Sequence, residues 1–325
     1  MSESAPTPTV LTLSADDAGE RIDRVLARRC PEFSRSALQR WIEQGRVEQS
    51  GEVVSRKTKA VDGAEVLIHP APPEAMSAEP QAIPLQLLFE DEHLIIVDKP
   101  AGLVVHPAPG HPDGTLVNAL LHHAQVRGGP DPLRPGIVHR LDKDTSGVMV
   151  VAAGVTDHTD LVRQLEQRSV QREYRAVCDG VLTAGGTVDA PIGRHPGDRL
   201  RMAVRQGGRP AVTHYRVVER FRAHTDLRAT LETGRTHQIR VHMAHLGYPL
   251  VGDRTYGGRL RIPKGAGEEL RQTLRGFRRQ ALHAVRLKLI HPQSGEEVEF
   301  TSPLRVDHES LLANLRRDAE AMRDG

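Results

Sequence analysis

Apolar residues in the first part of the chain recur at the spacing of two amphipathic helices. They are Ile22, Val25 and Leu26 in the first helix, and Leu38, Trp41 and Ile42 in the second. In this interpretation residues 16–19 cap the first helix, Pro31 ends it, and Ser34 caps the second helix. Strand-like segments are expected around the helices, over residues 9–13, 46–48 and 65–68.

A stretch without periodic apolar residues separates this unit from the rest of the chain. Residues 70–84 contain five prolines, a composition that favours an extended, semi-rigid spacer. We therefore predict a flexible tail over residues 1–8, a small domain over residues 9–69, a linker over residues 70–84, and a larger domain over residues 85–325.

The pattern after residue 85 predicts a larger unit built from both strands and helices. Short alternating or buried runs indicate strands over residues 93–97, 148–153, 170–178, 213–221, 227–232, 280–284 and 298–300. Thr115 and Thr156 are predicted to cap two helices, a further helix begins after His237, and a terminal helix carries Leu311, Leu312 and Leu315. Residues 193–210 are expected to form a loop, and residues 257–279 an insertion rich in Gly and Arg.

One aromatic residue is placed by strand periodicity. On the predicted strand 170–178, Tyr174 shares a face with Ala176 and Cys178, whereas polar side chains alternate on the other face. Tyr174 is therefore expected to point inward. It is either a packed core tyrosine or a ring that lines a pocket.

Composition describes a globular protein with enough apolar material for a core. Hydrophobic residues make up 38% of the chain and charged residues 26%, while aromatic residues reach only 3%, too few for extensive stacking on single strands. The two cysteines, Cys30 and Cys178, form no disulfide framework, which fits a reducing compartment. No signal-peptide core and no bilayer-spanning run is visible, so we expect a cytoplasmic protein without membrane attachment.

The net charge of +2 hides a local concentration of arginine. Arg24, Arg35 and Arg40 lie outside the apolar stripes of the two N-terminal helices. Arg194, Arg199 and Arg201 lie in the predicted loop 193–210, which contains a single acidic residue. Guanidinium groups pair bidentately with phosphate oxygens, so both groups are candidate nucleic-acid contacts. An ordinary solvated surface fits the same residues.

A polar cluster stands directly before the buried run 148–153. It contains Arg140, Asp142 and Asp144, and Gly147 after them indicates a turn or a close backbone approach. Polar groups held against a buried strand suit a positioned catalytic group. A charged turn in which Asp142 pairs with Arg140, or caps a backbone N–H, fits the same residues.

Histidines are numerous but do not have the spacing of a metal site. His106 and His111 are flanked by prolines, and His237, His242 and His245 are interspersed with arginines that would repel a cation. No Gly-rich nucleotide-binding loop is visible either. We therefore expect neither a metal nor a cofactor.

Several segments together resemble a known family. Residues 139–147 (HRLDKDTSG), 172–174 (REY), 234–242 (GRTHQIRVH) and 281–284 (ALHA) follow the order and spacing of RluA-type pseudouridine synthases. Residues 21–24, 34–36 and 42–47 resemble the S4 RNA-binding domain. Residues 201–204, 210–215 and 263–266 are similar to those members that modify the helix 69 stem-loop of large-subunit rRNA. The resemblance covers about residues 9–303.

This resemblance implies an α+β fold. A small S4 domain would precede a catalytic domain whose mixed, mainly antiparallel sheet is flanked by helices and loops. The implied reaction converts specific uridines of 23S rRNA into pseudouridine and needs no redox cofactor or ATP. Asp142 would be the nucleophile, Arg240 its cationic partner, and Tyr174 would stack on uracil and help remove the C5 proton. Arg140 would enter the RNA stack where the flipped base left a gap.

Other interpretations remain open. RluC-like enzymes share the domain layout and act on other 23S rRNA uridines. A non-catalytic S4-type ribosome assembly factor would not need Asp142, Tyr174 and Arg240, and a glycoside hydrolase using Asp142 and Asp144 would not need an S4 domain. We expect a monomer that acts on 23S rRNA or on pre-50S ribosomal particles.

Overall fold

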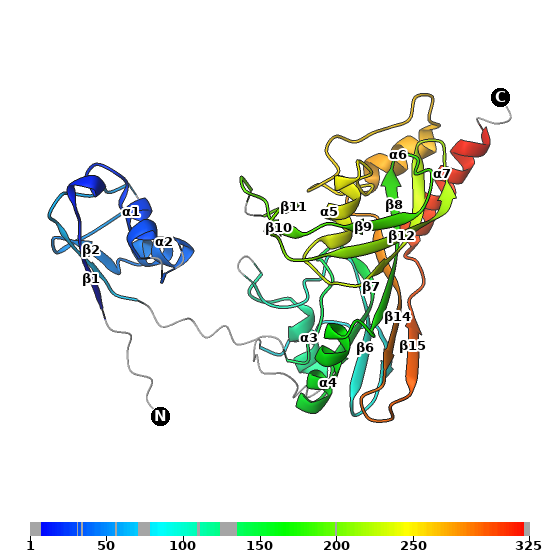
Figure 1. Cartoon of the computed structure of the whole chain (residues 1–325), viewed down its shortest axis with the longest axis horizontal. Helices are drawn as coiled ribbons and strands as arrows, with labels where there is room; N and C mark the ends of the chain where they lie inside the picture. Colours follow the sequence, from blue (N-terminus) through cyan, green and yellow to red (C-terminus); the bar gives the residue numbers. More distant parts are fainter. Residues whose placement is uncertain are drawn as a thin grey trace. The chain divides into compact units, whose positions relative to one another are not determined.

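The computed structural model describes residues 8–30, 32–33, 35–55, 57–70, 79–108, 111–123, 135–198 and 200–321, without the side chains of residues 35–37. The chain divides into two compact units, Met1–Met76 and Ser77–Gly325, and each is described by itself (Figure 1). The boundary falls within the predicted linker 70–84. The predicted tail up to residue 7, residues 71–78 of the linker, Pro31 and Ser34 lie outside the described residues.

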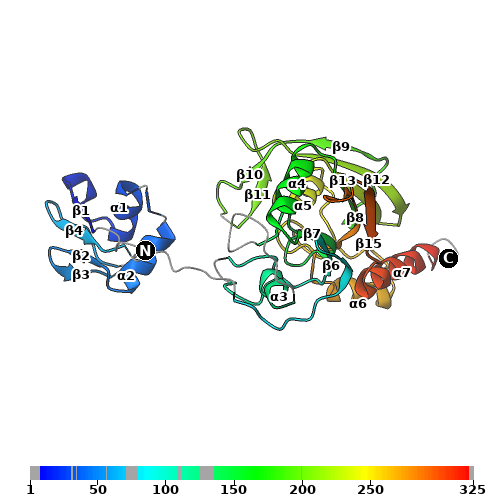
Figure 2. The ribbon, with the colours of Figure 1, turned by 90° about the horizontal axis from the view of Figure 1, so that it is seen from below.

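The N-terminal unit is a four-stranded antiparallel sheet with two helices on one face (Figure 2). The strands are β1 (Thr9–Thr12), β2 (Val47–Gln49), β3 (Glu52–Val53) and β4 (Glu65–Ile68), in the order β1-β4-β2-β3. The helices α1 (Ile22–Arg29) and α2 (Arg35–Glu43) pack on each other. Both predicted apolar stripes are buried in the core of this unit: Ile22, Val25, Leu26, Leu38, Trp41 and Ile42.

The predicted cap of α1 is wrong in detail. Residues 16–19 are not its cap, because Arg21 is the N-cap, and a 3-10 turn, η1 (Ala15–Asp17), precedes it. The carboxylate of Asp17 is buried and binds Arg28 and Arg29 at 2.7 and 2.6 Å. Two arginines of α1 are therefore neutralised within the unit.

A nine-stranded sheet forms the centre of the C-terminal unit. Its main path is β5 (Leu87–Glu90), β6 (Leu94–Lys99), β7 (Ser146–Ala152), β14 (Leu282–Ile290), β8 (Gln171–Asp179), β13 (His224–Leu231), β12 (Val212–Arg220) and β9 (Gly186–Asp189), with β15 (Glu297–Thr301) paired to β14. The pairs are antiparallel except β7–β14, which is parallel. The mixed, mainly antiparallel sheet is confirmed, and each predicted strand is present.

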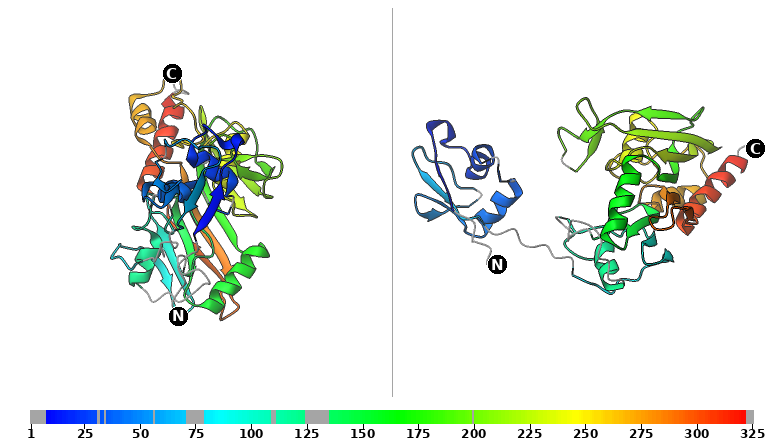
Figure 3. Two further views of the ribbon diagram at one scale, coloured as in Figure 1. Left: turned by 90° about the vertical axis from the view of Figure 1, so that its left-hand side faces the viewer. Right: turned by 60° about the horizontal axis from the view of Figure 1, so that its bottom comes forward.

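Helices pack against this sheet at both ends. The helices α3 (Leu116–His123) and α4 (Val155–Glu166) lie toward one end, whereas α6 (Glu268–Gly276) and α7 (Val306–Ala321) lie side by side toward the other (Figure 3). Between them, α5 (Gln238–His245) contacts β12. The predicted inward residues of the terminal helix are buried in one core with α6: Leu311, Leu312 and Leu315. Thr115 precedes α3 as expected, but α4 is capped by Gly154 rather than Thr156.

Two segments predicted to be irregular contain regular structure. Residues 193–210 contribute to an antiparallel hairpin of β10 (Ile192–Arg194) and β11 (Met202–Val204), and residues 257–279 contain α6. Glycines and prolines obscure these elements in the sequence. Leu270 and Leu274 of α6 have helical spacing and reach the core.

The C-terminal unit also includes the end of the predicted linker. The Glu79 carbonyl accepts a hydrogen bond from Asn118 Nδ2 at 2.7 Å, and the Gln81 N–H donates to the Asn118 carbonyl at 2.9 Å. Residues 79–81 are therefore attached to α3.

Candidate active site

A close approach of two strands positions the loop that carries Asp142. Strand β7 runs parallel to β14, with Gly147 opposite Ala284. Gly147 has a φ of +117°, and a Cβ at this position would lie 2.2 Å from the Ala284 carbonyl oxygen. Only glycine fits such a position, as the sequence predicts. The loop over residues 139–145 is thus anchored at the centre of the sheet.

Buried and partly buried hydrogen bonds also hold the residues at the end of this loop. Gln280 Nε2 donates to Thr145 Oγ1 at 3.0 Å, and Lys99 Nζ donates to the Lys143 carbonyl at 3.0 Å. Ser146 Oγ lies 2.9 Å from His283 Nδ1. These contacts fix the loop, which presents the carboxylate of Asp142 and the side chain of Arg140 to the pocket.

Arg240 joins two carboxylates. Its Nη1 donates to Asp142 Oδ2 at 3.0 Å, and its Nε and Nη2 donate to the two oxygens of Asp253 at 2.6 and 3.0 Å. The bidentate pair fixes the plane of the guanidinium. Burial would lower the pKa of Arg240, but the bonds to Asp253 and the charge of Asp142 outweigh it and raise that pKa. Asp142 thus pairs with a permanent cation on α5, not with Arg140 in a local turn.

His237 faces Asp142 from another direction. Its Nε2 lies 3.9 Å from Asp142 Oδ1, and its Nδ1 lies 2.7 Å from the Tyr256 hydroxyl. That hydroxyl accepts the Met202 N–H at 2.9 Å. When the hydroxyl donates its own proton to Nδ1, the ring proton lies on Nε2, toward Asp142. Burial lowers the pKa of His237, with the charge of Asp142 opposing the shift, so the ring is neutral at pH 7.

Two residues of β8 form another wall of the site. Arg172 and Tyr174 occupy alternate positions of the strand, so they share a face, and their exposed fractions are 7% and 6%. Burial raises the pKa of Tyr174, and the positive charge of Arg172 opposes that shift. The phenol is therefore protonated at pH 7. Of the two interpretations of Tyr174, the structure favours the ring that lines a pocket.

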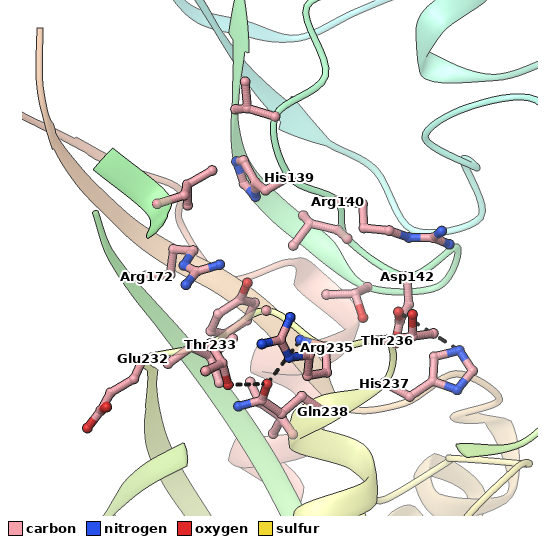
Figure 4. A pocket seen from close by; sticks show the side chains of 18 of the residues that line it. His139, Arg140, Asp142, Arg172, Glu232, Thr233, Arg235, Thr236, His237 and Gln238 are labelled. Carbon is pink, nitrogen blue, oxygen red and sulfur yellow. Dashed lines mark hydrogen bonds and ion pairs between the residues drawn. The ribbon is translucent and has the colours of Figure 1, made fainter. Parts of the chain in front are cut away.

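One pocket of about 740 Å³ is lined by Asp142, Arg172, Tyr174, His237 and Arg240, and its size is typical of small-molecule sites. Figure 4 shows Asp142 and His237 on one side and Arg172 on the other. Further arginines line it: Arg140, Arg168, Arg209 and Arg235. The pocket therefore combines a paired carboxylate, a buried aromatic ring and a set of positively charged arginines.

The predicted RNA-contacting arginines of the C-terminal unit lie in two places. Arg140 is exposed and lines the pocket. Arg194 is exposed on the β10–β11 hairpin, and the guanidinium of Arg201 lies 5.4 Å from the ring centroid of Tyr256. Because Tyr256 contacts His237, the hairpin is connected to the site. Arg199 lies outside the described residues.

In the N-terminal unit, Arg24 is exposed on α1 and Arg40 is exposed on α2. The side chain of Arg35 lies outside the described part of the structure. The exposed pair can therefore meet a polyanion in solution.

Sequence reasoning missed several members of the site. Arg172 could have been found, because it precedes Tyr174 by two positions on an alternating strand. Asp253 and Tyr256 had no local signal, since neither lies in a recognisable motif. Asp253 is nevertheless fully buried, and its Oδ1 also accepts the backbone N–H groups of Thr255 and Tyr256 at 2.9 and 3.0 Å.

Two negative findings concern the described residues alone. Within the ranges given above, no group of three or more His, Cys, Asp or Glu side chains is placed to hold a metal ion. In the same part of the chain, no helix combines the length and the apolar character needed to cross a bilayer.

Comparison with known proteins identifies the family of this chain. The family described as RNA pseudouridylate synthase matches residues 93–245. "Ribosomal large subunit pseudouridine synthase D" of Xanthomonas campestris pv. campestris is 55% identical, over 93% of this chain and 91% of the relative. The protein of that name from Escherichia coli K12 is 53% identical over 96% of both chains.

Two solved structures of RNA pseudouridylate synthases resemble the chain. "Human RNA Pseudouridylate Synthase Domain Containing 4" superposes with a TM-score of 0.54 at 25% identity, covering 71% of this chain and 92% of the human one. "Human RNA Pseudouridylate Synthase Domain Containing 1" has a TM-score of 0.53, also at 25% identity, and covers 75% of this chain and 97% of its own.

The chain belongs to the RNA pseudouridylate synthases, a family of isomerases. Among them it is an RluA-type enzyme, similar to the members named synthase D.

Proposed function

We propose that this enzyme converts specific uridines of 23S rRNA into pseudouridine, with the helix 69 stem-loop as its target. The observation that supports the chemistry most directly is the carboxylate of Asp142, paired with Arg240 at 3.0 Å in a pocket that Tyr174 also lines. The names of the relatives support large-subunit rRNA as the substrate. The motifs near residues 201–204, 210–215 and 263–266 support helix 69.

The proposed roles follow from the reaction. The N1–C1′ bond of uridine breaks and the base is rejoined through C5, so no atom is gained or lost. Asp142 stabilises or traps the positive charge that develops at C1′. Arg240 orients Asp142 and, as a permanent cation, favours its ionised form. Tyr174 stacks on the uracil, and because its phenol is protonated in the free enzyme, it must lose that proton before it can accept one from C5.

The arginines that line the pocket support RNA binding. A uridine in a stem-loop reaches such a pocket only by leaving the stack. We assign Arg140, which is exposed and lines the pocket, to fill the gap. Burial and the positive charges of Arg209 and Arg168 lower the pKa of Arg235, so these groups repel one another in the free enzyme. Phosphate oxygens between them would remove that repulsion.

The N-terminal unit is proposed to be the S4 RNA-binding domain. Its two short helices present the exposed Arg24 and Arg40, and the resemblance to the S4 domain adds Arg35 to these candidate RNA contacts. We further propose that the enzyme is a monomer in the cytoplasm, where it meets 23S rRNA or pre-50S particles.

Direct detection of the product tests this proposal. The protein is incubated with 23S rRNA and with pre-50S particles, and pseudouridines are mapped in both, and also in rRNA from cells that lack the protein. We expect new pseudouridines in helix 69 that disappear in those cells. Pseudouridines at other positions would favour the RluC-like alternative, and binding without any product would favour an assembly factor.

Removal of residues 1–76 tests the role of the N-terminal unit. The cut must precede Glu79, because the contacts of Glu79 and Gln81 with Asn118 belong to the catalytic unit. We expect the rate at saturating RNA to change less than about threefold and the Kd to rise about tenfold or more, as phosphate contacts are lost. An unchanged Kd would contradict the S4 assignment.

A further inference from the structure

Arg172 is a buried cation without a partner among the described residues. It is 7% exposed, and among the described residues its guanidinium has neither a hydrogen bond nor an ion pair; its Nε is fully buried without an acceptor. Buried charges in proteins are normally paired. A buried, unpaired guanidinium that lines a pocket therefore indicates an acceptor that the ligand brings.

The backbone around Arg172 leaves room for the guanidinium. A Cβ at Gly234 would lie 2.8 Å from Arg172 Nη1, so any larger residue at position 234 would displace the group. Gly234 lines the pocket together with Thr233 and Arg235. The guanidinium thus lies between β8 and the turn that leads into α5, on the same face of β8 as Tyr174.

Depth in the pocket distinguishes Arg172 from the arginines that suit phosphates. Arg140, Arg168 and Arg209 are exposed, whereas Arg172 is buried. An RNA backbone stays with the exposed groups, while the flipped base enters. Uracil offers two strong acceptors, the carbonyl oxygens O2 and O4, and a guanidinium can donate to either.

We propose that Arg172 binds a carbonyl oxygen of the flipped uracil and stabilises the charge that the base gains during the reaction; this rests on the proposed function. When the N1–C1′ bond breaks, its electron pair stays on the base, and the negative charge spreads from N1 to O2 and O4. A hydrogen bond from a guanidinium strengthens as that charge develops. The pocket then places Asp142 where positive charge forms and Arg172 where negative charge forms.

Thio-substituted RNA tests this assignment. Single-turnover rates and Kd values are measured for wild type, Arg172→Lys and Arg172→Met on helix 69 stem-loops that carry uridine, 2-thiouridine or 4-thiouridine at the target. We expect Arg172→Met to lower the rate on uridine RNA about 100-fold or more, with a Kd within about threefold, as when an oxyanion donor is removed. Arg172→Lys should fall between. Because sulfur is a weak acceptor, the loss should shrink at least about fivefold on one of the thio substrates.

Two control variants separate a contact with the base from a contact with phosphate. Arg168→Met removes an exposed pocket arginine that pairs with Glu232, and the loss of a phosphate contact should raise the Kd by a similar factor on all three substrates. Gly234→Ala keeps the charge of Arg172 but displaces Nη1, and it should lower the rate at an unchanged Kd. If Arg172→Met does not fold, Arg172→Lys and Gly234→Ala carry the same prediction.

Two results would overturn the assignment. One is a wild-type rate for Arg172→Met on uridine RNA. The other is an equal loss on all three substrates with a raised Kd, which would indicate a phosphate contact. The wild-type rate on uridine RNA reports on the proposed function alone, whereas the ratio of wild type to variant reports on Arg172.

Discussion

Arg240 and Arg172 are both buried in one pocket, yet their surroundings differ. Arg240 donates three hydrogen bonds to two carboxylates, and its pKa is raised. Arg172 has no acceptor among the described residues, and burial lowers its pKa. A charge that the protein neutralises serves to orient another residue. A charge that the protein leaves unpaired is available to the substrate.

The largest expected effect comes from the carboxylate that Arg240 orients. Asp142→Asn removes the charge needed at C1′ but leaves the phosphate contacts, so we expect the single-turnover rate to fall on the order of a thousandfold or more. The RNA Kd should stay within about twofold. Asp144→Asn, the same change two residues away, should retain activity within about threefold. A near wild-type rate for Asp142→Asn would remove Asp142 from the mechanism.

The second-largest effect is expected when the guanidinium that pairs with Asp142 and Asp253 is removed. Arg240→Met leaves Asp253 buried without its cation, which should lower the free energy of unfolding by about 3–5 kcal/mol and the rate by about 100-fold. Arg240→Lys should fall between, because lysine keeps the charge but loses the bidentate geometry. Urea unfolding and single-turnover rates measure both effects. An unchanged free energy of unfolding for Arg240→Met would show that the pairing with Asp253 does not stabilise the fold.

A smaller effect on rate and stability is expected from the residues that hold His237 beside Asp142. Tyr256→Phe removes the hydroxyl that links the Met202 N–H to His237 Nδ1. The free energy of unfolding should fall by about 1 kcal/mol, and the rate by roughly fivefold, because the imidazole of His237 loses the hydrogen bond that orients it. His237→Gln in the same background should then cost less than in wild type. Additive losses would show that the two residues act independently.

The effect that is smallest at neutral pH concerns the Arg172 side of the pocket and develops only as the pH falls. Burial lowers the pKa of His139 to about 3, the charge of Arg172 adding to the shift, and its Nε2 accepts the Val150 N–H at 3.1 Å. The unfolded residue titrates near 6.5. Between about pH 6.5 and 3 the unfolded chain therefore binds a proton that the folded chain does not, and stability falls as the pH falls.

His139→Gln should reduce this acid sensitivity, since Gln accepts the same bond without titrating. We expect the slope of unfolding free energy against pH, measured in urea from pH 7 to 4, to decrease by about 1 kcal/mol per pH unit. His308 has a burial-lowered pKa of about 3 as well and remains as an internal reference. Identical slopes for both proteins would contradict a titration at His139.

Local patterns in the sequence determined most of the secondary structure and the focus of the site. The period-two strand 170–178 placed Tyr174 inward, and the polar cluster before a β-branched run placed Asp142 at the edge of a buried strand. Gly147 signalled a close backbone approach that the structure shows as contact with Ala284. The regular repeats of helix and strand act over a few residues, so such features are visible without knowledge of the fold.

Tertiary structure alone decided which charges are paired. Asp142 and Arg240 are 98 residues apart and meet only because β7 and α5 converge on one pocket. Asp253 had no motif to reveal it. The lack of a partner for Arg172 among the described residues could not be predicted either, because it depends on every side chain that the fold keeps away from it. Ion pairs and their absence are properties of packed surfaces, and a one-dimensional pattern does not contain them.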